Sequence, residues 1–405
     1  MAATNTVSNR IKAFNADLLP KLVERKYELL SEDPFRFYRG TCHIFYEDLA
    51  KTASTLPATP DVWLSGDLHL ENFGSYKGDN RLVYFDISDF DEGILGPASW
   101  ELARMITSIF VGFETLKISF KNAGKCANVF LKTYTETLAT GKARRIELET
   151  ASGIVRELLE KVSNRKQREW LEKRIKEDKN GNFAFREIGD KQLELKKDLK
   201  KLLIHHITNL TLYNNDKLDN FKVLDACFRI AGTGSLGLKR YIFLIETVTD
   251  KKRLWLLDMK QARRSSLSPY INAKQPVWES EAQRAISIKF RMQDVPEALL
   301  TTTNFKGDTY ILQEMQPTED KIDFHQVEDH YSRIYEAIHD MAMLTASAQL
   351  RSAGMRGSAV ADDLMNYGKN DTWQKQIVEY AKDYAEQVKK DYLQYSNDYK
   401  HHFFR

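Results

Sequence analysis

Apolar residues recur at helical spacing through much of the first half of the chain. In residues 10–32 they fall every three to four positions, and the segments 97–116 and 120–138 repeat the pattern with a wider apolar face. This spacing places apolar side chains on one side of a helix. We therefore expect helices over these three segments, with the segment Asp33–Gly40 ending the first of them and a further short helix after it.

Charged residues dominate the segment 155–202. Its basic pairs alternate with Glu and Asp, which is typical of the solvated face of a helix. The run Lys179–Asn182 contains the Gly and Asn residues of a turn. We expect a mostly helical segment that is interrupted at this turn.

A β-type pattern replaces the helical one at about residue 221. Short runs of β-branched, aromatic and aliphatic residues are separated by turns, and a helical pattern returns from residue 325 to the end with a break near Gly354–Gly357. The expected elements are strands at 223–231, 237–246, 253–260 and 309–315, a turn at 249–251 and a helix at about 278–293. This order predicts an α+β protein of two lobes, with a helical part at 1–219, an antiparallel β unit at 220–319 and C-terminal helices at 320–405.

Composition narrows the classes of partner. With 405 residues, 42% of them hydrophobic, the chain can bury the cores of two lobes, and a formal charge of +3 gives no reason to expect nucleic acid as a partner. Cys42, Cys126 and Cys227 lack metal-ligand spacing, so we expect reduced thiols. The N-terminal residues lack a signal-peptide pattern, and no apolar run approaches the ~18 residues of a membrane helix. We expect a cytoplasmic protein that does not bind membranes.

The most informative segment is SGDLHLENFGSYKGDNRLVYFDISDFDE, which follows the first short apolar run after the N-terminal helices. Its candidate polar side chains are Asp67, His69, Asn72, Asp86 and Asp89. Phosphoryl transfer uses such a set, because it needs a carboxylate that orients a hydroxyl, and amide and carboxylate oxygens that bind metal ions. Two nearby carboxylates repel each other unless a cation lies between them, which favours a metal site.

A second group of candidate residues lies between two expected strands. The segment IAGTGSLG at 230–237 contains the pattern G-x-G-x-x-G, and the strand after the next turn ends on a lysine. A dinucleotide site needs a helix after the third glycine, whereas residues 238–246 have a strand pattern. Glycines between strands instead allow backbone N–H groups to approach phosphates. The candidate nucleotide-binding residues are Gly232, Thr233, Gly234, Ser235, Gly237 and Lys260.

The two groups resemble motifs of kinase-like enzymes. The first resembles the Gly-Asp-x-x-x-x-Asn loop and the following Asp-Phe of aminoglycoside phosphotransferases, and the second resembles the glycine loop and strand lysine of protein kinases. The resemblance implies ATP and Mg²⁺ as cofactors. It makes Asp67 the base, with His69 bracing the loop or touching the acceptor. It assigns the metal to Asn72 and Asp89, with Asp86 as the alternative to Asp89.

The resemblance also implies roles outside these motifs. Lys260 should pair with a glutamate of the following helix, either Glu279 or Glu281, of which Glu281 lies deeper in the helix. The strand that ends at Glu314 and Met315 corresponds to the hinge that faces adenine in kinases.

The motifs come in an unusual order. Kinases place the glycine loop before the catalytic loop, whereas Asp67 here precedes Gly232. A circular permutation explains this order, because it preserves packing when the joined ends lie close together. We therefore expect a circularly permuted, two-lobed kinase-like fold, in which Lys260 lies within about 10 Å of Asp89 across a nucleotide cleft.

The same order is similar to that of a bacterial family known as domain of unknown function 2252. The matching pieces run from about Pro34 to about Ser352 and include GDLHLENFG, DFDE and GTGSLG. Glu101 stands where that family has aspartate in Trp-Asp-Leu, and Gln349 stands where it has histidine in Ala-His-Ala-Arg. Compared with aminoglycoside phosphotransferases, Ser65 replaces the histidine before Gly-Asp. None of these departures removes an expected metal ligand.

These motifs favour a phosphotransferase that uses ATP and Mg²⁺ and acts on a hydroxyl of a small molecule. Two alternatives keep the same fold: an adenylyltransferase, and a nucleotide-binding pseudokinase that regulates a partner. A pseudokinase has no need of a base, so the complete set of Asp67, Asn72, Asp89 and Lys260 argues against it. The sequence leaves the acceptor and the oligomeric state open.

Overall fold

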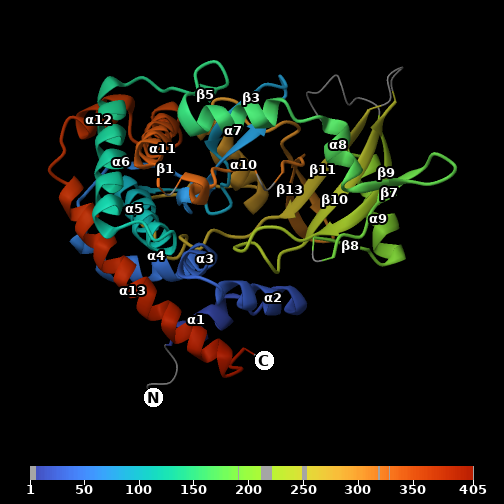
Figure 1. Cartoon of the computed structure of the whole chain (residues 1–405), viewed down its shortest axis with the longest axis horizontal. Coiled ribbons are helices and arrows are strands. Elements are labelled where there is room, and N and C mark those ends of the chain that lie inside the picture. Colours follow the sequence, from blue (N-terminus) through green and yellow to red (C-terminus); the bar gives the residue numbers. More distant parts are fainter. Residues whose placement is uncertain are drawn as a thin grey trace.

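Most helices gather on one side of the structure and the largest sheet lies on the other (Figure 1). This computed structural model describes residues 6–189, 191–210, 221–248, 253–317, 320–327 and 329–404. The expected turn at 249–251 lies outside the described residues. The α-helices are α1 (Val7–Phe14), α2 (Pro20–Leu30), α3 (Pro34–Gly40), α4 (Cys42–Thr52), α5 (Ala98–Thr115), α6 (Phe120–Thr140), α7 (Gly153–Ser163), α8 (Gln167–Glu172), α9 (Lys197–Thr208), α10 (Glu281–Met292), α11 (Tyr331–Arg351), α12 (Ala361–Gly368) and α13 (Gln374–Lys400).

The strands form four antiparallel sheets within the described residues. They are β1 (Asp61–Leu64), β2 (Phe73–Lys77), β3 (Val83–Ile87), β4 (Ile94–Pro97), β5 (Ile146–Glu147), β6 (Ile175–Glu177), β7 (Phe183–Phe185), β8 (Gln192–Leu193), β9 (Phe221–Arg229), β10 (Arg240–Thr247), β11 (Leu254–Gln261), β12 (Thr301–Phe305) and β13 (Asp308–Glu314). The expected α+β class is confirmed by this mixture of helices and sheets.

The N-terminal residues form two helices rather than the single helix expected over 10–32. α1 ends at Phe14, and Pro20 is the first residue of α2, a position that proline occupies readily because no helical hydrogen bond is lost. Asp33 likewise begins a helix instead of ending one, since its carboxylate accepts the N–H of Arg36 at 2.7 Å at the start of α3.

The two expected central helices are confirmed as α5 and α6. Nearly every residue of α5 is buried, because α3, α6 and α13 pack around it. The tyrosines of α13 anchor that helix to the N-terminal elements: the hydroxyl of Tyr395 donates to the carbonyl of Tyr27, and that of Tyr392 to the carbonyl of Ser31. α5 is therefore the rigid centre of the helical part.

The charge-dense segment 155–202 is less helical than expected. After α7 and the short α8, a hairpin of β6 and β7 turns at residues 178–182, where the carboxylate of Asp178 accepts the N–H groups of Asn180 and Asn182. Apolar residues of this region pack on the main sheet, and this tertiary contact outweighs the helical propensity of the charged residues. We refer to residues 167–189 as the cover segment.

The main sheet has six strands in the order β12-β13-β11-β10-β9-β8. The four strands expected at 223–231, 237–246, 253–260 and 309–315 are confirmed as β9, β10, β11 and β13, and the expected helix at 278–293 is α10. β12 and the two-residue β8 had no clear sequence signal. α9 packs on one face of this sheet, and the opposite face carries Lys260.

Short strands position the two acidic loops. β1 pairs with β4, and β2 pairs with β3, so that the loop at 65–69 and the loop at 88–93 leave neighbouring strands. A 3-10 turn at Leu70–Asn72 connects the first loop to β2. No helix in the described part of the chain is both long and apolar enough to cross a lipid bilayer.

Candidate active site

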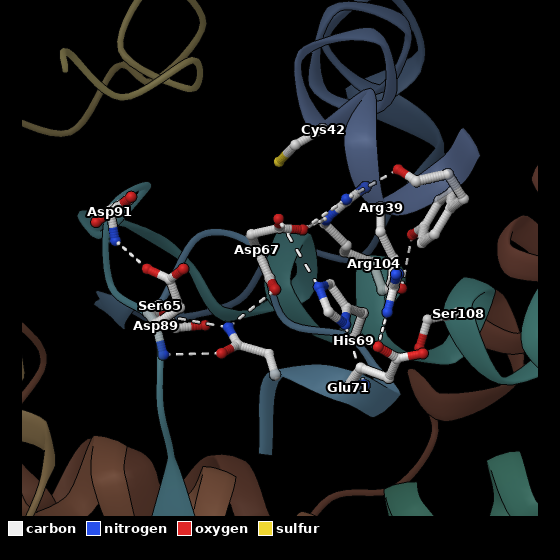
Figure 2. Close-up of polar contacts among 12 residues, drawn as sticks. Arg39, Cys42, Ser65, Asp67, His69, Glu71, Asp89, Asp91, Arg104 and Ser108 are labelled. Carbon is white, nitrogen blue, oxygen red and sulfur yellow. Dashed lines mark hydrogen bonds and ion pairs between the residues drawn. The ribbon is translucent and has the colours of Figure 1, made fainter. Parts of the chain in front are cut away.

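Asp67 lies at the centre of a polar cluster between β1 and α5 (Figure 2). Its Oδ1 accepts a hydrogen bond from Nε of Arg104 at 2.7 Å and forms an ion pair with Nη2 of Arg104 at 2.6 Å. Arg104 belongs to α5 and is fully buried, with its guanidinium 4.4 Å from the ring of Tyr38. Burial raises the pKa of Asp67, and the charge of Arg104 opposes this rise. Arg104 thus fixes one carboxylate oxygen and leaves Oδ2 for another partner.

His69 stands beside Asp67 as a neutral ring. Burial, followed by the charge of Arg39, holds the pKa of His69 well below its usual value. Nδ1 of His69 accepts the N–H of Glu71 at 3.1 Å, so the ring proton is on Nε2. Nε2 lies 3.9 Å from Oδ2 of Asp67. Nε2 thus faces the free oxygen of the expected base at a distance too long for a hydrogen bond.

Asn72 joins the two acidic loops. Its Nδ2 donates to the backbone carbonyls of Asp67 at 3.0 Å and Asp89 at 3.1 Å, and its Oδ1 accepts the N–H of Asp89 at 2.8 Å. Oδ1 also accepts the hydroxyl of Ser88 at 3.3 Å. The amide of Asn72 fixes the distance between the expected base and the expected metal ligand, and a metal ion would compete with the N–H of Asp89 for its oxygen.

Lys260 reaches the second acidic loop from the end of β11. Its Nζ lies 3.3 Å from Oδ2 of Asp89 and also forms an ion pair with Asp91. The expected proximity of Lys260 and Asp89 is confirmed. Desolvation raises the pKa of Asp89, but the ammonium of Lys260, the N–H of Asp91 and the charge of Lys289 together outweigh it and hold that pKa below its usual range. Burial and the neighbouring Asp89 raise the pKa of Asp91.

Asp86 points into a different environment from Asp89. It is 4% exposed, its Oδ1 accepts the N–H of Ile87 at 2.8 Å, and its Oδ2 lies 3.9 Å from Nη1 of Arg351. Asp89 lines the cavities described below, whereas Asp86 lines neither. Of Asp86 and Asp89, the two alternative metal ligands, only Asp89 lines these cavities.

Burial of Asp86 leads to a prediction about pH. It raises the pKa of Asp86 to about 6, above the value in the unfolded chain. A carboxyl with this shift stabilises the fold fully below about pH 4 and loses that contribution as the pH rises through about 6. We expect Asp86→Asn to increase the free energy of unfolding by about 3 kcal/mol at about pH 8 and to change it little near pH 4. Urea unfolding at both pH values measures this, and an equal difference at both would contradict it.

The glycine loop lies between β9 and β10 and packs on the N-terminal helices. The carbonyl of Gly234 accepts Nζ of Lys26 at 2.9 Å, and that of Gly237 accepts the N–H of Leu19 at 3.0 Å. Gly237 has a φ of 101°, and an added Cβ would lie 2.7 Å from Leu18. Both its backbone conformation and its close approach to Leu18 therefore require glycine.

Glu281, which was expected to pair with Lys260, has a different partner. Glu281 pairs with Arg284 at 2.6 Å, so the expected ion pair with Lys260 is replaced by the pairs of Lys260 with Asp89 and Asp91. Glu281 is the first residue of α10, and its side chain pairs with a residue one turn later in the same helix.

Glu314 and Met315, the residues of the expected hinge, also have partners within the chain. The N–H of Glu314 donates to the carbonyl of Ala298 at 2.8 Å, and its carboxylate pairs with Arg81. The N–H of Met315 donates to the carbonyl of Leu256 at 2.8 Å. These two backbone hydrogen bonds, which the sequence does not reveal, use the donors that an adenine would need.

Two cavities meet at Asp89 and Asp91. The lysine cavity, of about 160 Å³, lies between the sheet and α10 and includes Lys260 in its lining. The Asp67 cavity, of about 90 Å³, lies under Gly234 and Ser235 of the glycine loop. Both expected motifs therefore contribute to one continuous group of polar side chains.

Several residues that line the lysine cavity were not predicted from the sequence. These are Arg240 of β10, Asp258 of β11, Lys289 of α10 and Lys321, which lies in a loop. Asp258 had a weak signal, since it lies two positions before Lys260 and hence on the same face of a strand. Burial lowers the pKa of Lys321 to about 8. Lys289 and Lys321 belong to no motif in the sequence, and folding brings both of them to the same cavity.

The carboxylates where the two cavities meet are too few to bind Mg²⁺ by themselves, but they could bind it together with a phosphate ligand. Among the described residues, no three His, Cys, Asp or Glu side chains form a metal-binding group. Mg²⁺ in phosphoryl-transfer sites is held by one or two carboxylates and completes its shell with phosphates and water. Asp89 and Asp91 supply two carboxylates beside a cavity lined by cations. These residues fit an ion that arrives together with a polyphosphate.

Residues 18–398 match the model of one protein family, described as "Uncharacterized protein conserved in bacteria (DUF2252)". The chain belongs to this family. The match confirms the resemblance drawn from the motifs and covers all the candidate site residues named above. No curated protein and no solved structure matches the chain. The kinase-like resemblance therefore rests on the residues of the chain itself.

The three departures noted in the sequence contact one another in this DUF2252 protein. Oε1 of Glu101 accepts the N–H of Ser65 at 2.6 Å and its hydroxyl at 2.6 Å, and also the N–H of Gly66 at 3.1 Å. Nε2 of Gln349 lies 3.5 Å from Oε2 of Glu101. The buried carboxylate of Glu101 thus supports the backbone immediately before Asp67.

Proposed function

We propose that this chain is a phosphotransferase that moves the terminal phosphoryl group of ATP, bound with Mg²⁺, to a hydroxyl of a small molecule. The observation that carries the proposal is the meeting of Lys260 with Asp89, residues 171 positions apart in the sequence, at 3.3 Å. Asp67 and Asn72 belong to the same cluster, since Asn72 bonds the backbone of both Asp67 and Asp89. A lysine, two carboxylates and a loop aspartate are the groups that position and neutralise a transferring phosphoryl group.

Each residue has a proposed role. Lys260 would bind the donor's phosphates, and Asp89 and Asp91 would hold the metal ion, which supplies positive charge to the phosphates when bound. Asp67 accepts the proton of the acceptor hydroxyl through Oδ2, which Nε2 of His69 faces, while Arg104 holds the carboxylate in place. The glycine loop closes the Asp67 cavity from above.

The order of elements around the cleft supports a kinase-like, circularly permuted arrangement. From β9 the chain runs through strand, glycine loop, strand, lysine-bearing strand, helix and two further strands, which is the order of motifs in a kinase N-terminal lobe. Restoring the kinase order requires the present ends of the chain to be joined. The hydroxyl of Ser8 donates to Oδ2 of Asp398 at 2.7 Å, so those ends are close enough.

Ligand-dependent stability tests the proposal. We expect ATP with Mg²⁺ to raise the melting temperature, because a ligand at 100 times its Kd stabilises the native state by about 2.7 kcal/mol. Asp89→Ala should remove the dependence of this shift on Mg²⁺, while Asp371→Ala, at an exposed position on the surface, should preserve it. A wild-type shift that is identical with and without metal would count against the site.

A further inference from the structure

The face of the main sheet that carries Lys260 is divided into a polar end and an apolar end. Lys260 lies opposite Arg240, Asp258 lies opposite Ile242, and Leu256 lies opposite Leu244 in the pairing of β10 with β11. Because alternate residues of a strand share a face, Lys260, Asp258 and Leu256 follow one another along this single surface. A nucleotide bound with its phosphates at Lys260 would extend its base along this surface toward Leu256.

The polar end is a small, charged cavity. It is lined by the cations Arg240, Lys260, Lys289 and Lys321, and by the carboxylates Asp89, Asp91 and Asp258, which a bound Mg²⁺ would neutralise. Its volume is about 160 Å³. Sites that enclose ligands of nucleotide size have about 300–1,000 Å³. The cavity therefore suits a chain of phosphates and leaves no enclosed space for a sugar and a base.

The cover segment fills the apolar end. Leu171, Ile175 and Phe185 form one buried cluster with residues of the sheet, among them Leu244 and Leu256. The segment is also hydrogen-bonded to the sheet: the N–H of Phe185 donates to Asp225 at 2.7 Å, and Nε2 of Gln167 donates to the carbonyl of Leu254 at 3.1 Å. These contacts occupy the surface on which a base would stack.

A buried ion cluster separates the two ends. Asp258 is 2% exposed and pairs with both Arg229 and Arg240. At the edge of the sheet, the N–H groups of Glu314 and Met315 are already bonded to the carbonyls of Ala298 and Leu256. The carbonyl of Gln316 faces Nη2 of Arg229 at 3.5 Å. The two backbone donors expected to face an adenine are therefore already used by the chain itself.

We propose that the phosphoryl donor is recognised through its phosphates alone, so that ATP, GTP, CTP and inorganic triphosphate bind equally well with Mg²⁺. This inference rests on the proposed function and deepens it, since it names the donor as a class of triphosphates. The base lies outside the lysine cavity and contributes no selectivity.

Calorimetric titration of the full chain tests this inference. With Mg²⁺ in excess, we expect the Kd values of ATP, GTP, CTP and inorganic triphosphate to agree within about threefold. A Kd for ATP about 30-fold or more below those of GTP and CTP would overturn the inference while leaving the phosphotransferase proposal standing. If none of the four probes binds, the phosphotransferase proposal itself fails, and the inference fails with it.

Two variants separate phosphate recognition from general attraction to the chain. Lys321→Met removes a cation of the lysine cavity and should weaken all four probes by the same factor, about tenfold. Lys274→Met removes an exposed lysine outside that cavity and should leave all four Kd values unchanged. Weakening of ATP alone by Lys321→Met, or equal weakening by both variants, would contradict recognition at the lysine cavity.

Discussion

Replacing Asp67 with asparagine is expected to slow ATP turnover by at least ~100-fold, the usual scale for loss of a positioned base. Asparagine can still accept the hydrogen bond of Arg104 at Oδ1, so the geometry of the loop should persist. The side chain loses the proton-accepting oxygen that faces the Asp67 cavity. Because the triphosphate lies beside Lys260 in our proposal, the Kd of ATP should change little.

Phosphate release and ATP binding, measured on the same preparations, give the readout. Asp371→Asn serves as the matched control, since it removes an exposed carboxylate far from any contact with the site, and should behave as wild type. Full turnover by Asp67→Asn would show that the base is assigned wrongly. Loss of ATP binding together with turnover would instead show that Asp67 contributes to the donor site.

Arg104→Met is expected to lower the free energy of unfolding by about 3 kcal/mol, because it leaves the carboxylate of Asp67 without its buried counter-charge. The guanidinium of Arg104 is fully buried and is also in contact with the rings of Tyr38 and Phe45, so methionine cannot replace its interactions. Chemical unfolding at neutral pH measures the loss.

Arg156→Met provides the comparison for this stability prediction. Arg156 pairs with Glu160 on the exposed face of α7, where an ion pair contributes little. Its replacement should leave unfolding unchanged within error. Equal stability of Arg104→Met and wild type would mean that the pair of Arg104 and Asp67 does not stabilise the loop, and the proposed positioning of the base would lose its support.

The sequence predicted the parts of the site that depend on local pattern. Apolar periodicity located α5 and α6 and the strands β9, β10, β11 and β13, because each buries a continuous apolar stripe or run. The spacing of Asp67, Asn72 and Asp89 placed them in two loops that follow short strands, and the proximity of Lys260 and Asp89 followed from the order of motifs.

Contacts between distant segments were not predictable from pattern. The cover segment looked helical because its residues are charged, yet Ile175 and Phe185 pack on the sheet and make β6 and β7 strands. Glu281 and Met315 had the right sequence positions for a nucleotide site, but one pairs along its helix with Arg284 and the other is bonded to β11. Partners of this kind are set by register and packing, which single-sequence periodicity does not specify.

Transfer of label from ATP is the most direct test of the central claim. Wild-type protein is incubated with a pool of small hydroxylated metabolites, Mg²⁺ and ATP labelled at either the γ or the α phosphate, and Asp67→Asn is run beside it. We predict that label from the γ phosphate alone appears in a small-molecule product, and that the variant forms this product at least ~100-fold more slowly. Transfer of the α label, or no transfer of either label, would contradict a phosphotransferase.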